Sequence, residues 1–248
     1  MKTQDRMGAR MQFQGFSQAT GDFLWGLTMN NDRAWFQAHR DEFETHLNRP
    51  FRALLADTLA LMRARYPDLE LESHVSRIYR DARRLFGRGP FKDHLWFTIQ
   101  TGSHRDGGPV FWCEVGATGW NYGAGIWDDA ADLSEGFRRH IDADLPRFEA
   151  LAADIAALGD YRLYGERYKR PKGTRSPLID PWYNSKHHSA GRECPFGGPM
   201  FDPALPELLA EEYGKLMPLY RFLLEVWRDV TAQRAAKFAQ AALGGEFL

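Results

Sequence analysis

The chain has only two cysteines among its 248 residues, and it has no long apolar run. Two thiols are too few for a disulfide framework, so we expect Cys113 and Cys194 to be reduced. No stretch approaches the roughly 20 consecutive apolar residues of a membrane span. The first 14 residues alternate charged and polar side chains instead of forming the apolar centre of a signal peptide. These absences predict a cytoplasmic protein with no membrane partner.

The sequence also lacks the short motifs that mark common catalytic and cofactor sites. It contains no Gly-x-Ser-x-Gly, no phosphate loop ending in Gly-Lys-Ser/Thr, and no Gly-x-Gly-x-x-Gly after a predicted strand. His187, His188, Cys194 and Asp180 offer metal-ligand chemistry, but adjacent histidines do not have the spacing of a zinc motif. We therefore predict no metal site, and the cofactor stays unknown.

What the chain does have is ample material for a core. Apolar residues make up 44% of it and charged residues 26%, and eight Trp and 17 Phe supply bulk for the interior. A length of 248 residues fits one larger mixed domain. We expect a flexible tail over residues 1–15 and a single domain over residues 16–242.

Two hydrophobic periods divide the sequence. Apolar residues recur three or four positions apart between residues 23 and 66, 133 and 155, and 205 and 230, which is typical of amphipathic helices. Between residues 95 and 127 the period is two, which predicts antiparallel strands. Further strands are expected at residues 73–80 and, at a sheet edge, 161–168. The fold class is therefore α+β, an antiparallel sheet packed by N-terminal and C-terminal helices.

Two further features of these segments bear on where a functional site could lie. Gly123 and Gly125 fall inside a predicted strand and indicate a bulge or a close backbone approach. Residues 170–203 are rich in Pro and Gly and are expected to form one long loop, which in a compact domain is usually functional or disordered.

Charge is segregated along the chain. Residues 77–92 contain six basic residues and one acid, and residues 162–175 again contain six and one. Each segment carries +5, so a chain of net charge -1 has -11 on its other residues. Because like charges repel without a counter-charge, we predict that both segments converge on one concave surface that binds an anion. The candidate binding residues are Arg77, Arg80, Arg83, Arg84, Lys92, Arg167, Lys169 and Lys172.

Each segment also has a structural interpretation. Residues 77–92 could be a solvated basic loop in which Asp81 pairs with a neighbouring arginine. Residues 161–175 interleave tyrosines with cations, as single-strand nucleic-acid binders do, but an edge strand kept charged against aggregation has the same composition.

One family shares the order of several short motifs in this chain. Asn30-Asn31-x-x-x-Trp-Phe is followed by Arg80-Asp81-x-Arg, by Pro90-Phe-Lys and by Gly123-x-Gly. In this the chain resembles the domain-of-unknown-function family 2461 over most of residues 16–170. The family has a Lys-Asp-Lys after its Arg-Phe, whereas residues 84–88 here read Arg-Leu-Phe-Gly-Arg and lack the acid. The resemblance implies an α+β fold and no activity.

Three functions remain open from the sequence. The first is binding of a phosphorylated or carboxylated small molecule through the arginine-rich segment. The second is an enzyme on such a molecule, with Arg80, Arg83 and Lys92 as clamps and His94 or His187 as the proton-transfer group. The third is a non-enzymatic module for a protein or a single-stranded nucleic acid. No binding of duplex nucleic acid is expected, and the oligomeric state stays open.

Overall fold

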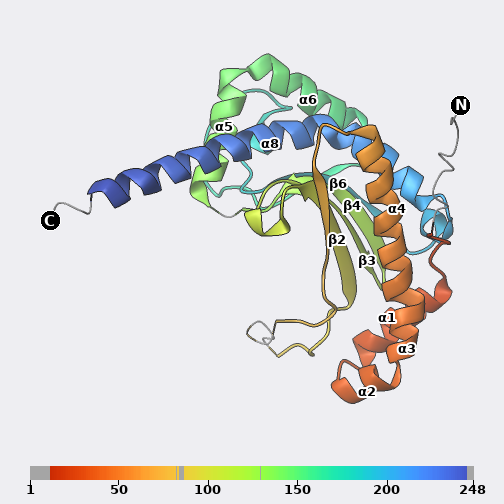
Figure 1. Ribbon diagram of the computed structural model, residues 1–248. Helices are drawn as coiled ribbons and strands as arrows, with labels where there is room; N and C mark the ends of the chain where they lie inside the picture. Colours follow the sequence, from red (N-terminus) through yellow and green to blue (C-terminus); the bar gives the residue numbers. More distant parts are fainter. Residues whose placement is uncertain (1–11, 82, 84–86, 129, 245–248) are drawn as a thin grey trace, which may run out of the picture.

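A six-stranded antiparallel sheet forms the centre of the computed structural model, which describes residues 12–81, 83, 87–128 and 130–244 (Figure 1). The strand order is β1-β2-β3-β4-β6-β5. This architecture confirms the predicted α+β class. The strands are β1 Leu71–Val75, β2 His94–Thr101, β3 Val110–Gly116, β4 Gly119–Ile126, β5 Arg162–Tyr164 and β6 His188–Pro195.

Helices precede, interrupt and follow the strands. The N-terminal third is helical, as predicted, and the long α4 and α8 pack on one face of the sheet (Figure 1). The α-helices are α1 Gln18–Met29, α2 Arg33–Ala38, α3 Arg40–Glu42, α4 Arg49–Arg65, α5 Ala131–Ala143, α6 Leu145–Ala157, α7 Asp180–Tyr183 and α8 Leu205–Gly244. A π-helix, η1 Phe43–Asn48, joins α3 to α4, and two 3-10 turns are η3 His104–Asp106 and η4 Gly198–Phe201.

The predicted alternation of β2 sorts its side chains onto two faces. Leu95, Phe97 and Ile99 are almost fully buried in the core against the helices. Trp96 and Thr98 point to the opposite side, which we call the open face. Side chains of the open face line a cavity, so this face can receive a ligand.

The C-terminal helix is longer than the sequence pattern indicates. The helical period predicted between residues 205 and 230 belongs to one helix of 40 residues, α8, with Pro218 inside it. Two buried tyrosines fasten α8 to the sheet: the Tyr213 hydroxyl donates to the Trp112 carbonyl at 2.8 Å, and the Tyr220 hydroxyl donates to Thr101 Oγ1 at 3.0 Å.

Two expectations about irregular segments are wrong. Residues 12–15 belong to the packed structure, since Phe13 is fully buried and its N–H donates to Asp57 Oδ2 at 2.7 Å; residues 1–11 lie outside the described residues. The expected loop over residues 170–203 contains α7, η4 and an entire strand, β6, between β4 and β5. Small residues such as Ala190 and Gly191 hide the alternation that would have revealed this strand.

The predicted strand over residues 73–80 is shorter than expected. Beyond β1 the chain leaves the sheet, and its described residues 76–81 and 87–92 form the two sides of a hairpin that projects from the body (Figure 1). Its two sides are held by backbone bonds from Arg80 N to the Pro90 carbonyl, 2.8 Å, and from Lys92 N to the Ile78 carbonyl, 2.7 Å. We call this segment the basic arm. Among the described residues, no helix has both the length and the apolar character to cross a bilayer.

Candidate functional site

Two adjoining hollows occupy the open face and the base of the basic arm. Each has a volume of about 560 Å³, and His74 and Trp96 line both. The first, the aromatic cavity, is lined by His74, Trp96, Thr98, Gln100, His104, Gly107, Gly108, Val110, Trp112, Glu114, Asn121, Trp127 and Tyr164. The second, the basic groove, is lined by His74, Ser76, Arg77, Tyr79, Arg80, Asp81, Arg83, Arg88, Lys92 and Trp96.

The floor of the aromatic cavity is the indole ring of Trp112, which is only 7% exposed. It lies over Gly123 on β4 and Gly191 on β6, the next two strands of the sheet. A Cβ on Gly123 would overlap the ring, and one on Gly191 would come within 2.7 Å of it. Trp127 meets the ring edge-on, with centroids 4.7 Å apart. The glycines of β4 and β6 therefore make room for an aromatic platform, and the predicted close approach at Gly123 is confirmed.

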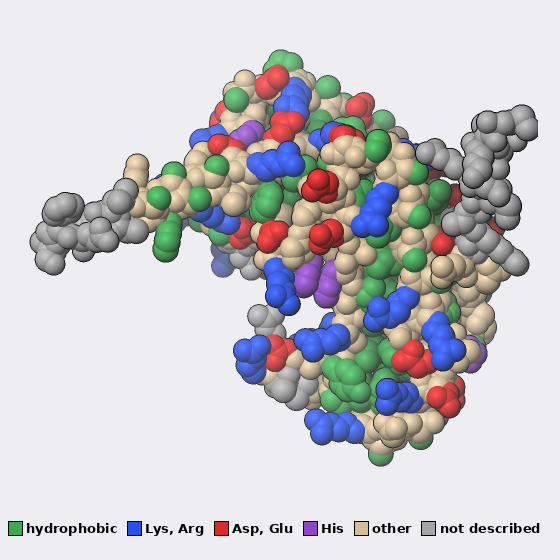
Figure 2. All heavy atoms as spheres, viewed as in Figure 1, with side chains coloured by type: hydrophobic (Ala, Val, Ile, Leu, Met, Phe, Trp, Pro, Cys, Tyr) green, Lys and Arg blue, Asp and Glu red, His purple; other side chains and the backbone are tan. Residues whose placement is uncertain are grey.

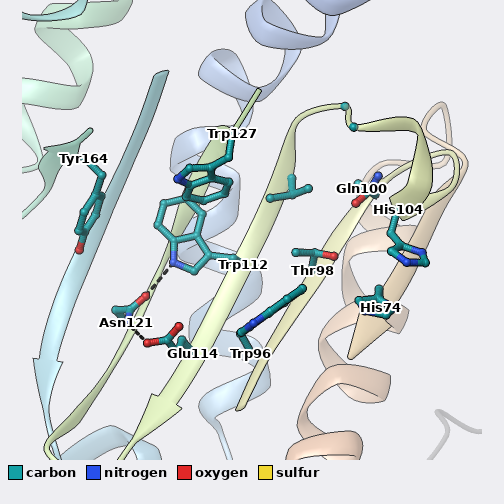
Figure 3. A pocket seen from close by; sticks show the side chains of 13 residues that line it. His74, Trp96, Thr98, Gln100, His104, Trp112, Glu114, Asn121, Trp127 and Tyr164 are labelled. Atoms are coloured by element: carbon teal, nitrogen blue, oxygen red, sulfur yellow. Dashed lines mark hydrogen bonds between the residues drawn. The ribbon is translucent and has the colours of Figure 1, made fainter. Parts of the chain in front are cut away.

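A line of polar contacts runs along the open face. Trp112 Nε1–H donates to Asn121 Oδ1 at 2.8 Å, and Asn121 Nδ2 donates to Glu114 Oε1 at 3.4 Å (Figure 3). Glu114 Oε2 lies 3.9 Å from His94 Nε2, and His94 Nδ1 lies 2.9 Å from Asp93 Oδ1. The hydrogen bond from His94 lowers the pKa of Asp93 against the opposing effect of its burial. The line leads from the aromatic cavity toward the basic arm.

The basic groove contains one cation that is fixed and one that is partly desolvated. Arg80 is held by a bond from Nε to the Phe91 carbonyl at 2.7 Å and by Asp93 at 3.5 Å. Lys92 Nζ donates to the Arg77 carbonyl at 2.8 Å and lies 5.7 Å from the centre of the Trp96 ring. Burial first, and then the charges of Arg80 and Arg77, lower the pKa of Lys92.

The other cations of the groove reach toward solvent. Arg83 pairs with Asp81 at 2.9 Å, and this hydrogen bond raises the pKa of Arg83, as the pairing interpretation of this segment expected. The Arg77 guanidinium makes no hydrogen bond or ion pair with any residue that the structure describes. Lys and Arg side chains gather around the hollow beside the arm (Figure 2).

Two histidines mark the rim where the hollows meet. The rings of His74 and His104 stack with centroids 3.9 Å apart and planes within 5°. Burial, followed by the charges of His104 and Lys92, lowers the pKa of His74. His74 therefore adds a neutral imidazole to the site at pH 7.

The predicted binding residues do not all line the two hollows. Arg77, Arg80, Arg83 and Lys92 line the basic groove, whereas Arg84 lies outside the described residues. Arg167, Lys169 and Lys172 follow β5, at the sheet edge opposite β1, and none of them lines either hollow. Five strand spacings separate these edges, roughly 24 Å along the sheet. The two basic segments lie at opposite edges of the sheet, and their meeting on one surface stays a prediction.

The second segment has its own local partners. Lys172 Nζ lies 4.7 Å from the centre of the Tyr168 ring, and Lys172 N donates to Asn184 Oδ1 at 2.6 Å. Arg167 forms an isolated β-bridge with Ser185. β5 pairs only with β6 and is the predicted edge strand.

The histidines singled out from the sequence are dispersed. His94 and His187 line neither hollow. His188 is 1% exposed and stacks on Phe137 at 3.6 Å, and burial lowers its pKa to about 3. Cys194 lies near the other end of β6, and Asp180 Oδ1 accepts from Arg175 N. In the part of the chain that the structure describes, no three His, Cys, Asp or Glu side chains are grouped to hold a metal ion.

The sequence missed the aromatic cavity as a site. Trp96, Trp112 and Glu114 fall within the period of two predicted between residues 95 and 127, but that pattern does not say which face is covered by helices. His74, Asn121 and Trp127 join them only through the strand register, in which Trp96 faces Glu114 and Glu114 faces Asn121.

Comparison with known proteins gives the chain a family. No curated protein matches it. The family model described as "Conserved hypothetical protein (DUF2461)" matches residues 19–222, which is most of the chain. The chain therefore belongs to the DUF2461 family, as its short motifs indicated.

Proposed function

We propose that the protein binds a small anionic molecule, through a phosphate or carboxylate group, in the basic groove. The observation that carries this proposal is the composition of one hollow. Five cationic side chains and a single carboxylate line it: Arg77, Arg80, Arg83, Arg88 and Lys92, with Asp81.

The electrostatics of the groove favour an added negative charge. Lys92 is held near Arg80 and Arg77, whose charges oppose its protonation. An anion between them reverses this effect, because it stabilises every nearby cation. Arg80 is already anchored by the Phe91 carbonyl, so little of its freedom is lost on binding. The planar fork of Arg77 matches two oxygens of a phosphate or carboxylate.

Thermal unfolding at low salt with inorganic phosphate and with citrate tests the proposal. A ligand at 100 times its Kd stabilises a protein by about 2.7 kcal/mol, which at this size raises Tm by roughly 5–10 °C. Arg77→Gln should lose most of this shift. Arg167→Gln makes the same chemical change on the other basic segment, and this variant should keep the Tm shift.

Two results would overturn the proposal. One is that neither anion raises the Tm of the wild type. The other is that Arg77→Gln and Arg167→Gln reduce the shift equally, because that would indicate a general effect of net charge.

A further inference from the structure

Trp96 stands between the two hollows and has opposite charges on its two sides. Its ring lies 5.7 Å from Lys92 Nζ. In the strand register its partner is Glu114, and cross-strand partners have neighbouring side chains on one face (Figure 3). Because Trp96 and His74 line both hollows, a ligand that extends from the basic groove into the aromatic cavity runs along these two rings.

Two polar side chains of the aromatic cavity, Glu114 and Gln100, are arranged to accept hydrogen bonds. The Trp112 indole N–H can only donate, so Asn121 turns its oxygen toward it and its amide toward Glu114. The Gln100 amide donates to the Ser103 carbonyl at 3.0 Å, which leaves the Gln100 oxygen as an acceptor. Glu114 and Gln100 therefore offer acceptors to N–H or O–H donors of a ligand in this cavity.

The walls suit a flat ring. Trp127 is 50% exposed and stands edge-on to Trp112, and Tyr164 lies 5.9 Å from the Trp112 ring on the far side. Aromatic side chains stack on planar heterocycles, each stacked base contributing about 1–3 kcal/mol. Each hollow has a volume of about 560 Å³, which is typical of small-molecule sites. The ring can therefore occupy one hollow and the anionic group the other.

We infer that the ligand is a heterocycle that carries a phosphate, as a nucleoside monophosphate does. Its ring stacks on Trp96, two N–H donors on the ring edge bind the Glu114 carboxylate, and the phosphate lies by Lys92 and Arg77. This inference rests on the proposed function.

A cationic ligand does not fit the same observations. Aromatic cages bind quaternary ammonium groups through ring faces, but Lys92 already lies at the Trp96 ring and would repel a second cation. A quaternary ammonium also has no N–H for Glu114. The donor pair of a guanine edge, by contrast, matches the two oxygens of a carboxylate.

Isothermal titration calorimetry with three probes tests the inference: ribose phosphate, adenosine monophosphate and guanosine monophosphate. The account predicts that guanosine monophosphate binds at least about tenfold more tightly than ribose phosphate, because of stacking. It also predicts tighter binding than adenosine monophosphate, whose ring edge presents an acceptor to Glu114. Glu114→Gln should reduce the affinity for guanosine monophosphate about tenfold and leave ribose phosphate unchanged. Trp96→Leu should reduce both nucleotides to the level of ribose phosphate.

The failures are distinguishable. Equal affinity of all three probes overturns the inference and leaves the proposed anion binding intact. Equal affinity of the two nucleotides, or no effect of Glu114→Gln, overturns the assignment of the donor edge. Binding of none of the probes, together with no response to inorganic phosphate, overturns the proposed function and the inference with it. If Glu114→Gln does not fold, Trp96→Leu and the three probes on the wild type still decide.

Discussion

The indole ring of Trp112 lies over the backbone of Gly123, its partner in the register of β3 and β4, so that a Cβ at residue 123 would overlap the ring. Gly191 on β6 continues the same surface. This contact sets the shape of the aromatic cavity, because it fixes the ring that forms the cavity floor.

Gly123→Ala should therefore destabilise the protein by about 1–3 kcal/mol, the usual effect of overpacking a well-packed site. The tryptophan emission should also change, since Trp112 must move. Gly116→Ala on β3 is the matched control, because its Cβ would meet no atom closer than 3.7 Å. Chemical denaturation monitored by tryptophan fluorescence measures both the free energy of unfolding and the emission of the folded protein. Equal stability of the two variants would show that Trp112 is not held by this contact.

Local patterns predicted most of the secondary structure. Each of β2, β3 and β4, and each long helix, packs one side against the core. This leaves a regular period of apolar residues along the sequence, so these elements can be predicted from neighbouring residues. Strand β6 could not be found in this way, because Ser189, Ala190 and Gly191 are too small to show an alternation. Phe13 could not be placed either, since its burial depends on Asp57, 44 positions away.

Of the two hollows, the sequence predicted the basic groove and not the aromatic cavity, for a similar reason. The basic arm is contiguous in sequence, so its charge was visible there. The aromatic cavity is assembled across β1, β2, β3, β4 and β5, and only the strand order brings its residues together. The strand order also places the two basic segments at opposite edges of the sheet, which their charge alone could not indicate.

His188 should make the protein acid-sensitive. Its pKa is about 3 in the folded protein, below the ordinary 6.5, because burial disfavours the charged ring. The unfolded chain therefore binds an extra proton as pH falls below 6.5, and stability is lost down to about pH 3. By pH 5 the loss from this group is about 2 kcal/mol.

Replacing His188 should remove this loss. Neither ring nitrogen of His188 has a hydrogen-bond partner among the described residues, so His188→Leu should be neutral or stabilising at pH 7.5. Urea unfolding between pH 7.5 and pH 5 should give a flatter profile for His188→Leu than for the wild type. His140→Leu, on the adjacent α5, removes a histidine and leaves His188 in place. Parallel profiles for wild type and His188→Leu would contradict the account.

Anion binding should weaken at alkaline pH. The pKa of Lys92 is lowered from 10.5, so its charge is present at neutral pH and is lost as pH rises through that lowered pKa. Sulfate, which does not titrate in this range, is the suitable probe. Lys92→Arg should keep its affinity to higher pH than the wild type, because arginine stays charged. If the wild type and Lys92→Arg lose sulfate affinity at the same pH, Lys92 does not contribute to the site.

Duplex nucleic acid should not bind at physiological salt. The basic groove is flanked by a chain whose residues outside the two basic segments carry a charge of -11, and that charge repels a polyanion that extends beyond the groove. Fluorescence anisotropy with a duplex of about 30 base pairs measures this. Submicromolar affinity would mean that the second basic segment forms an extended surface with the arm.

The position of the bound anion is the central claim, and the indole N–H signals of a ¹⁵N-labelled protein test it most directly. The chain has eight tryptophans. With Trp96→Phe to assign its signal, titration with phosphate should shift the Trp96 indole and leave those of Trp25 on α1 and Trp182 on α7 in place. A shift of Trp182, which lies by the second basic segment, with no change at Trp96 would contradict the account.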